Sequence, residues 1–412
     1  MAVDYELICR NDDLGPLLAA AFLAKEKCRV LLLPPLPNKA PDPNFLIPVV
    51  RGYPAKLLAT LIDMEKPPAG FFSWQNGARV RSWPDSGGRD GGFPGFVESA
   101  LSQKLWLELK QLWQLLDLCM AQGLEMPASS LGGLGRMIWL LVRNELLRER
   151  RNCTLASRLD TAEIPLEEQQ FWRSLIPLIS LSRFADPPLL SFAYGVQTLL
   201  APDAWVWVAG LKKRLHEYLL SQGAHQVDEE WSPVFDGKWF IGVGNDAKVA
   251  RRATVFLADS DPNSLVQEVS LGQQRRDFKR QFQLDDPGYS HLQTVHDQIQ
   301  RPTGSALYHL DCRAADDFSG STLWGPKAEH SPGSIEHRWQ AAGGHLEQKK
   351  GAVWGWKPRL PAMMGGGFLS LTGSFCRFYQ VGWHNLPGFG LGGLVYSARQ
   401  AATAVLSNEL KR

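Results

Sequence analysis

The first 33 residues constrain the fold of this chain more than any other stretch. A short apolar run at 3–9 ends in a polar turn at 10–16, and a helix rich in Ala and Leu follows at 17–24. A second apolar run, in which Arg29 is the one charged residue, then returns at 28–33. Such a run is typical of a parallel strand that is buried on both faces. The stretch therefore predicts a βαβ unit within an α/β fold.

The same stretch resembles the N-terminus of FAD-dependent oxidoreductases of the phytoene desaturase and amine oxidase type. These proteins begin with a strand, a Gly-x-Gly-x-x-Gly turn, a helix of small residues and a second strand that ends in an acidic residue. The resemblance implies an FAD/NAD(P)-binding, Rossmann-like fold with FAD as cofactor and an inserted, mixed and helix-rich substrate-type domain. The positions that match the motif are Asn11, Asp13, Gly15, Pro16 and Pro34.

The residues at these positions depart from the family's chemistry. Asn11, Asp13 and Pro16 stand at the three glycines, and a side chain at the second obstructs the approach of a pyrophosphate to the backbone. A carboxylate about 4 Å from a phosphate also costs roughly 4 kcal/mol at an effective dielectric of about 20, which Arg10 offsets in part. Pro34 replaces the acid that holds the adenosine ribose, and it has neither a charge nor an amide hydrogen. The turn predicts a retained fold without its usual FAD contacts; the alternative is a flavin held in another way.

The last part of the chain carries the second half of the resemblance. A strand at 378–383 leads to a glycine turn at 387–393, which opens a final helix at 394–406. In the family, a Val-Gly-Asp strand and a Pro-Gly-x-Gly turn place a helix N-terminus against the flavin ring, where the helix dipole stabilises negative charge. Glycines can also persist for packing alone, so they are weaker evidence than the losses at the first turn. The matching positions are Gly382, Trp383 in place of the aspartate, Gly388, Gly390 and Gly392.

The chain is expected to form two interleaved domains, which its 412 residues can supply with separate cores. The expected segments are 1–60, 200–265 and 365–412 for the Rossmann-like domain, and 90–200 and 266–364 for the substrate-type domain. The clearest helical periodicity lies at 94–122.

A further helix is expected at 130–151, and its character supports two readings. The basic residues at its end complement the helix dipole. Alternatively, the apolar stretch from Leu131 to Leu147, which includes Trp139 and Leu140, forms a basic amphipathic element that contacts a membrane surface. No apolar run approaches the roughly 18 residues of a transmembrane helix.

Composition excludes several functional classes. The formal charge is +2 and the basic runs are brief, which disfavours a nucleic-acid surface. The six cysteines show no Cys-x-x-Cys pattern and no signal peptide is recognised, so we expect free thiols in the cytoplasm. The histidines at 291–345 form no His-x-x-x-His pair, and no metal site is predicted. Neither a nucleophile elbow nor a phosphate loop is present.

Three functional hypotheses follow. The first is an oxidoreductase-like pseudoenzyme with an eroded dinucleotide site, acting as a binding or scaffold subunit for an apolar small molecule or a protein. The second is an active FAD-dependent oxidoreductase or desaturase for an isoprenoid or amine, with Trp354 and Trp356 lining the substrate cavity. The third is a peripheral membrane or partner-binding protein that uses residues 94–151. The sequence predicts no catalytic residue.

Overall fold

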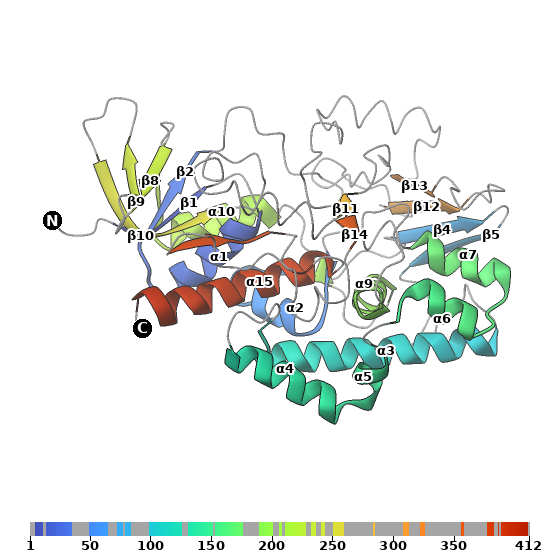
Figure 1. The fold of residues 1–412 in the computed structure, drawn as a ribbon. Helices are drawn as coiled ribbons and strands as arrows, with labels where there is room; N and C mark the ends of the chain where they lie inside the picture. Colours follow the sequence, from blue (N-terminus) through green and yellow to red (C-terminus); the bar gives the residue numbers. More distant parts are fainter. Residues whose placement is uncertain are drawn as a thin grey trace.

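The opening βαβ unit lies at the centre of the main sheet in the computed structural model (Figure 1). This sheet has the order β7-β2-β1-β10-β9-β8, and β15 pairs with β10 beside that path. Its strands are β1 (Tyr5–Arg10), β2 (Val30–Leu33), β7 (His225–Gln226), β8 (Ser232–Phe235), β9 (Phe240–Val243), β10 (Ala250–Ala258) and β15 (Phe378–Gln380). β7, β2, β1, β10 and β15 are paired in parallel, whereas β8, β9 and β10 form an antiparallel meander. The predicted α/β class with a parallel sheet is confirmed.

The structure describes residues 5–10, 14–34, 49–64, 72–76, 79–83, 99–125, 131–150, 153–175, 189–200, 206–207, 211–227, 232–235, 240–243, 250–258, 283–284, 308–312, 322–325, 356–357, 377–382, 386 and 389–410.

Helix α1 (Leu14–Lys25) is the core of this part of the molecule, because every residue from Gly15 to Ala24 is buried. The helix packs against β1 and β10 of the sheet and against two further helices, α10 (Leu211–Ser221) and α15 (Gly390–Ala404). A helix that is apolar on all sides belongs in a core. Its alanines allow the neighbouring helices to approach closely. Strand β2 is likewise fully buried, as expected for a central parallel strand.

The other elements form a second sheet, at the right of Figure 1, and a helical layer, most of which runs beneath the sheets. The second sheet has the order β13-β12-β4-β5. Its strands are β4 (Phe72–Asn76), β5 (Arg79–Trp83), β12 (Tyr308–Cys312) and β13 (Thr322–Gly325). The small pairs are β3 (Val49–Val50) with β6 (Val206–Trp207), and β11 (Gln283–Leu284) with β14 (Trp356–Lys357). The helices are α2 (Gly52–Leu58), α3 (Ala100–Ala121), α4 (Leu131–Arg143), α5 (Glu145–Arg150), α6 (Leu155–Thr161), α7 (Leu166–Ser174) and α9 (Leu189–Leu200). The domain boundaries given above stay a prediction.

Three helices differ from the sequence prediction. Helix α1 begins at Leu14, within the turn expected at 10–16. The helix expected at 130–151 is divided into α4 and α5 at Asn144, although the Asn144 N–H still donates to the Leu140 carbonyl at 2.9 Å. The final helix begins at Gly390 rather than at 394, and it continues as a π-helix, η5 (Val405–Leu410). The sequence predicts a turn at the start of α15, because glycines have low helix propensity. Tertiary packing, described below, requires them within the helix.

A buried carboxylate joins three helices of the helical layer. Glu108 of α3 is 8% exposed, and its Oε1 lies 2.5 Å from Nε of Arg150 in α5. Its Oε2 accepts from both Nε and Nη2 of Arg158 in α6, at 2.9 and 2.6 Å. Two charge-assisted bonds from one planar guanidinium fix geometry as well as adding energy. Glu108 therefore sets the positions of α5 and α6 against α3.

We expect Glu108→Gln to destabilise the fold by about 3 kcal/mol, because it leaves two partly buried guanidinium groups without their counter-charge. The matched control is Glu145→Gln, which removes an exposed pair with Arg148 at 3.3 Å and should change stability by no more than about 0.5 kcal/mol. Urea unfolding followed by circular dichroism measures both. Equal shifts in the two variants would contradict this role of Glu108.

Candidate functional site

The candidate site is the edge of the main sheet where its parallel strands end. β1 lies between β2, which follows it in the chain, and β10, which comes much later. The order of the strands therefore reverses at β1, which makes it a switch point of the sheet. In open α/β sheets, ligands bind outside the carboxyl ends of the strands at such a point. α1 begins directly beyond this edge, and the first turns of α15 pack beside it.

Gly15 permits three elements to meet at this edge. A Cβ atom added to Gly15 would lie 2.2 Å from the carbonyl oxygen of Val381, just after β15, and 3.2 Å from Cδ1 of Leu394 in α15. Any side chain would force the backbone apart, since the nearest atom belongs to the main chain. The glycine thus serves the close approach of α1 to the end of β15.

The turn before α15 holds the other retained glycines. Val381 and Gly382 are buried after β15, and Gly390 has a φ of +54°, in the left-handed region that favours glycine. A Cβ on Gly392 would lie 2.7 Å from the hydroxyl oxygen of Tyr194 in α9. Two of these glycines are therefore required by backbone conformation or by packing, whether or not a ligand is present.

Hydrogen-bond donors without acceptors gather at the start of α15. The backbone N–H groups of Gly390, Leu391 and Gly392 make no hydrogen bond within the described part of the chain, as is usual for the first turn of a helix. The fully buried hydroxyl of Tyr194 also has no partner there, and its ring stacks on Phe389 with centroids 4.7 Å apart. Burial, and then the charge of Asp117, raise the pKa of Tyr194 far above its ordinary value. The hydroxyl therefore stays protonated, so this end of the site favours an electron-rich group.

A buried polar cluster adjoins Tyr194. The guanidinium of Arg51, 4% exposed, lies 4.0 Å above the Trp113 ring and donates to the Gln197 carbonyl at 3.1 Å. Nearby, the carboxylate of Asp117 accepts from the Tyr53 N–H at 2.6 Å. Burial raises the pKa of Asp117, although that hydrogen bond and the charge of Arg51 act against the increase. The cluster links β3 and α2 to α3 and α9.

Pro34 follows β2 at the same edge and is half-buried. The preceding residue, Leu33, pairs with Arg10 at the end of β1, so Pro34 adjoins the switch point. A proline there offers no side-chain acceptor for a ribose hydroxyl and no N–H. The residues present thus do not fit FAD bound in the way that the fold's usual motif binds it, although the donors at α15 suit an electron-rich ring.

The structure brings together the predicted site residues that it describes. Gly15 and Pro16 lie in the first turn of α1, Pro34 follows β2, and Gly382, Gly390 and Gly392 surround the start of α15. The remaining positions lie outside the described residues, namely Asn11, Asp13, Trp383 and Gly388. Sequence reasoning did not identify Tyr194, because a tyrosine within the apolar stretch of α9 resembles an ordinary core residue.

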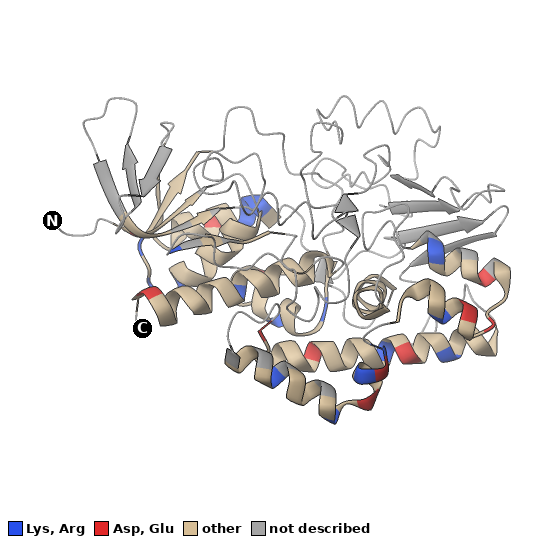
Figure 2. Ribbon diagram, in the orientation of Figure 1, with Lys and Arg blue, Asp and Glu red and all other residues tan. Residues whose placement is uncertain are grey.

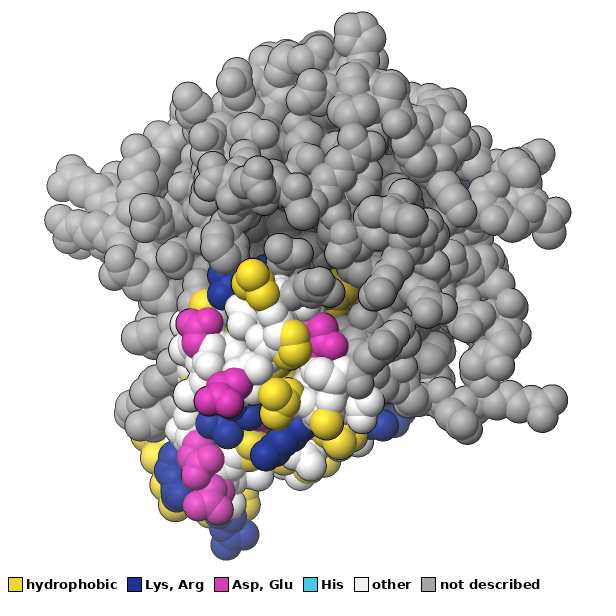
Figure 3. Space-filling model, turned by 90° about the vertical axis from the view of Figure 1, so that its right-hand side faces the viewer, with side chains coloured by type: hydrophobic (Ala, Val, Ile, Leu, Met, Phe, Trp, Pro, Cys, Tyr) yellow, Lys and Arg dark blue, Asp and Glu magenta, His cyan; other side chains and the backbone are white. Residues whose placement is uncertain are grey.

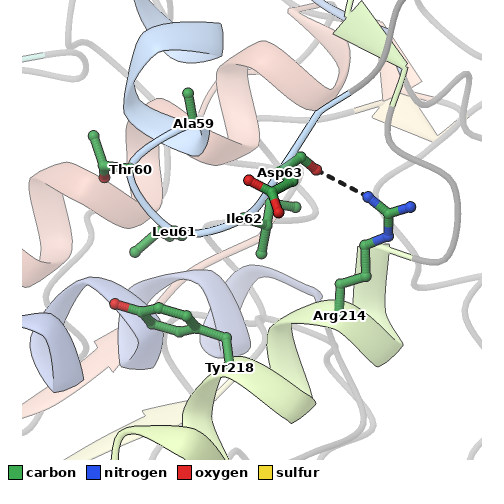
Figure 4. A pocket seen from close by; sticks show the side chains of 7 residues that line it. All are labelled: Ala59, Thr60, Leu61, Ile62, Asp63, Arg214 and Tyr218. Carbon is green, nitrogen blue, oxygen red and sulfur yellow. Dashed lines mark hydrogen bonds between the residues drawn. The ribbon is translucent and has the colours of Figure 1, made fainter.

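One cleft of about 640 Å³ opens among the described residues, between the loop after α2 and helix α10 (Figure 4). Its charged side chains are Asp63 and Arg214, and Arg214 donates to the main-chain carbonyl of Asp63 at 2.9 Å. Tyr218 lies on the α10 side of the cleft. These groups form neither a nucleophile–base pair nor a metal site, and across the described residues no three metal-ligating side chains converge.

Solved structures share this architecture over the whole chain, whereas no protein-family model and no curated protein sequence matches it. Cyclohexylamine oxidase from Brevibacterium oxydans IH-35A is 15% identical, with a TM-score of 0.52 over 99% of this chain and 100% of the oxidase. The chain has the FAD-binding amine oxidase fold. Wild-type putrescine oxidase bound to putrescine is 11% identical, with a TM-score of 0.52 over 98% of this chain and 99% of that protein. The resemblance found in the sequence is confirmed for the fold.

We expect Gly15→Ala to destabilise the protein by about 1–3 kcal/mol, because the added methyl group meets the rigid carbonyl of Val381. Gly135→Ala is the matched control: Gly135 lies in α4 and nothing is within 4 Å of its added Cβ, so the higher helix propensity of Ala should stabilise by up to about 1 kcal/mol. Chemical unfolding midpoints show whether each variant is stabilised or destabilised. A stabilising Gly15→Ala would show that α1 does not approach β15 so closely.

A second test concerns the contact between Gly392 and Tyr194. Gly392→Ala should cost about 1–3 kcal/mol through its clash with the tyrosine hydroxyl. Tyr194→Phe alone should be neutral or stabilise by about 1 kcal/mol, since the hydroxyl has no partner to lose among the residues that the structure describes. In the double variant the cost of Gly392→Ala should fall. Strictly additive effects in this double-mutant cycle would argue against the contact.

Proposed function

We propose that this protein is a non-catalytic relative, in fold, of the FAD-dependent amine oxidases, acting as a binding or scaffold subunit for an apolar small molecule or a protein. The observation that carries the proposal is Pro34 at the end of β2, where the fold's usual motif needs an acidic acceptor. The departures at Asn11 and Asp13 point the same way.

Residues that maintain the fold can be distinguished from residues that would bind the cofactor. Gly15 is needed for packing against Val381, and Gly392 for packing against Tyr194, so both can be retained without a cofactor. The ribose acceptor has no such packing role, and it is absent. A chain that keeps packing residues and lacks ligand contacts is what a scaffold of this fold requires.

The second candidate is an active FAD-dependent oxidoreductase that acts on an apolar isoprenoid or amine. The start of α15 favours it, because its N–H groups and the Tyr194 hydroxyl, which have no partner among the described residues, are donors suited to a flavin ring that gains electrons. In this case the adenosine half would be held by groups other than those of the usual motif.

Flavin content separates the two candidates. We expect the purified wild-type protein to release far less than one flavin per chain on denaturation, as measured by absorbance and chromatography of the supernatant. A stoichiometric flavin, reduced anaerobically by an amine or an isoprenoid, would overturn the non-catalytic proposal and establish the second.

Titration with added FAD tests the role of Pro34 directly. Pro34→Glu restores an acceptor, and a hydrogen bond to a charged group is worth about 1.5–3 kcal/mol, so FAD should bind at least about tenfold tighter than to the control Pro34→Ala. Equal affinities of the two variants would mean that this position does not limit binding.

A further inference from the structure

Helix α4 presents apolar side chains to solvent on one face. Ile138, Trp139 and Val142 are 53%, 52% and 66% exposed. Residues spaced by one, three and four positions lie on the same side of a helix, so these three side chains form one stripe. Leu140, which the sequence grouped with Trp139, is half-buried and lies outside the stripe.

Positive charge lies beside this stripe. Arg136 and Arg143 are exposed, and the guanidinium of Arg143 lies 4.3 Å above the centre of the Trp139 ring. Helix α4 contains no Asp or Glu, so Figure 2 shows blue but no red along it. In contrast, the face in Figure 3 carries positive and negative side chains next to one another over its described part. The stripe on α4 is therefore matched to a negatively charged partner.

The position of α4 favours a broad surface over a peptide. In Figure 1, α4 and α5 form the lower edge of the molecule, beneath α3. The Arg150–Glu108 ion pair fixes α5 to α3, and Gly133 packs so closely on Glu125 that an added Cβ would lie 2.2 Å from its Oε2. Over its described residues, α4 therefore meets a partner with one exposed side of a single helix that is held at an edge. A fluid lipid surface can receive such a helix without a complementary shape.

We propose that α4 docks this protein onto an anionic phospholipid membrane surface. Ile138, Trp139 and Val142 enter the boundary between head groups and acyl chains, where the amphipathic indole of tryptophan is favoured. Arg136 and Arg143 bind lipid phosphates while their aliphatic stems lie along the apolar layer. Attachment is peripheral, since none of the described helices is long and apolar enough to cross a membrane. The inference is independent of flavin binding.

Flotation of the full-length protein with vesicles tests the proposal. We expect binding to vesicles of phosphatidylcholine with phosphatidylserine, weaker binding to phosphatidylcholine alone, and loss of the difference at high salt, because exposed charges are screened. The variant Ile138→Ser/Trp139→Ser/Val142→Ser should reduce the bound fraction at least tenfold. Arg136→Gln/Arg143→Gln should remove the preference for the anionic lipid.

Leu107→Ser is the matched control, because Leu107 of α3 is 58% exposed but lies on another helix, and it should bind as wild type does. Circular dichroism and thermal unfolding verify that each variant folds. Absence of wild-type binding overturns the proposal, as does equal loss in the control. A dimer that the triple variant abolishes, without vesicle binding, would overturn it in favour of a protein interface.

Discussion

The close approach of α1 to the end of β15 is the constraint on which the rest of the main sheet depends. α1 is buried on every side, so the sheet, α10 and α15 are all positioned by it. Only a glycine at position 15 lets the Val381 carbonyl reach the helix. Because residues from both ends of the chain meet there, the N-terminal βαβ unit cannot complete its core until the last strand and helix are in place. Small residues are therefore required on both sides of this contact.

The sequence predicted those parts of the fold that depend on local patterns. The apolar run at 28–33 predicted the buried strand β2, and the periodicity at 94–122 corresponds to α3, whose N-cap Ser99 accepts from the Ser102 N–H. The predicted start of α15 was wrong, because its glycines resemble a turn in the sequence. Only the fold shows that Tyr194, far away in the chain, and Leu386, a few residues earlier, pack against them. Positions of this kind depend on tertiary packing, which propensity does not contain.

The candidate site likewise combines features that local sequence patterns predict with features that only tertiary packing creates. The resemblance pointed to this sheet edge and its glycines, and packing contacts account for Gly15 and Gly392. Neither Tyr194 nor the buried Arg51 could be found from the sequence, because nothing in α9 or after β3 distinguishes them from ordinary core and loop residues. Donors in this region come from α9, from α15 and from Arg51 between β3 and α2, which are far apart in the chain. Convergence of that sort is a property of the fold rather than of a motif.

The stacking of Arg143 on Trp139 has a consequence for the protein when it is free in solution. A guanidinium above the indole covers part of an otherwise bare aromatic surface and carries water with it. Exposed aromatic patches promote self-association, so we expect this charged cover to weaken self-association through α4. The same side chain can swing aside when a better acceptor for its charge arrives. One rotamer of Arg143 would then cover the indole in solution, and another would leave it open to a partner.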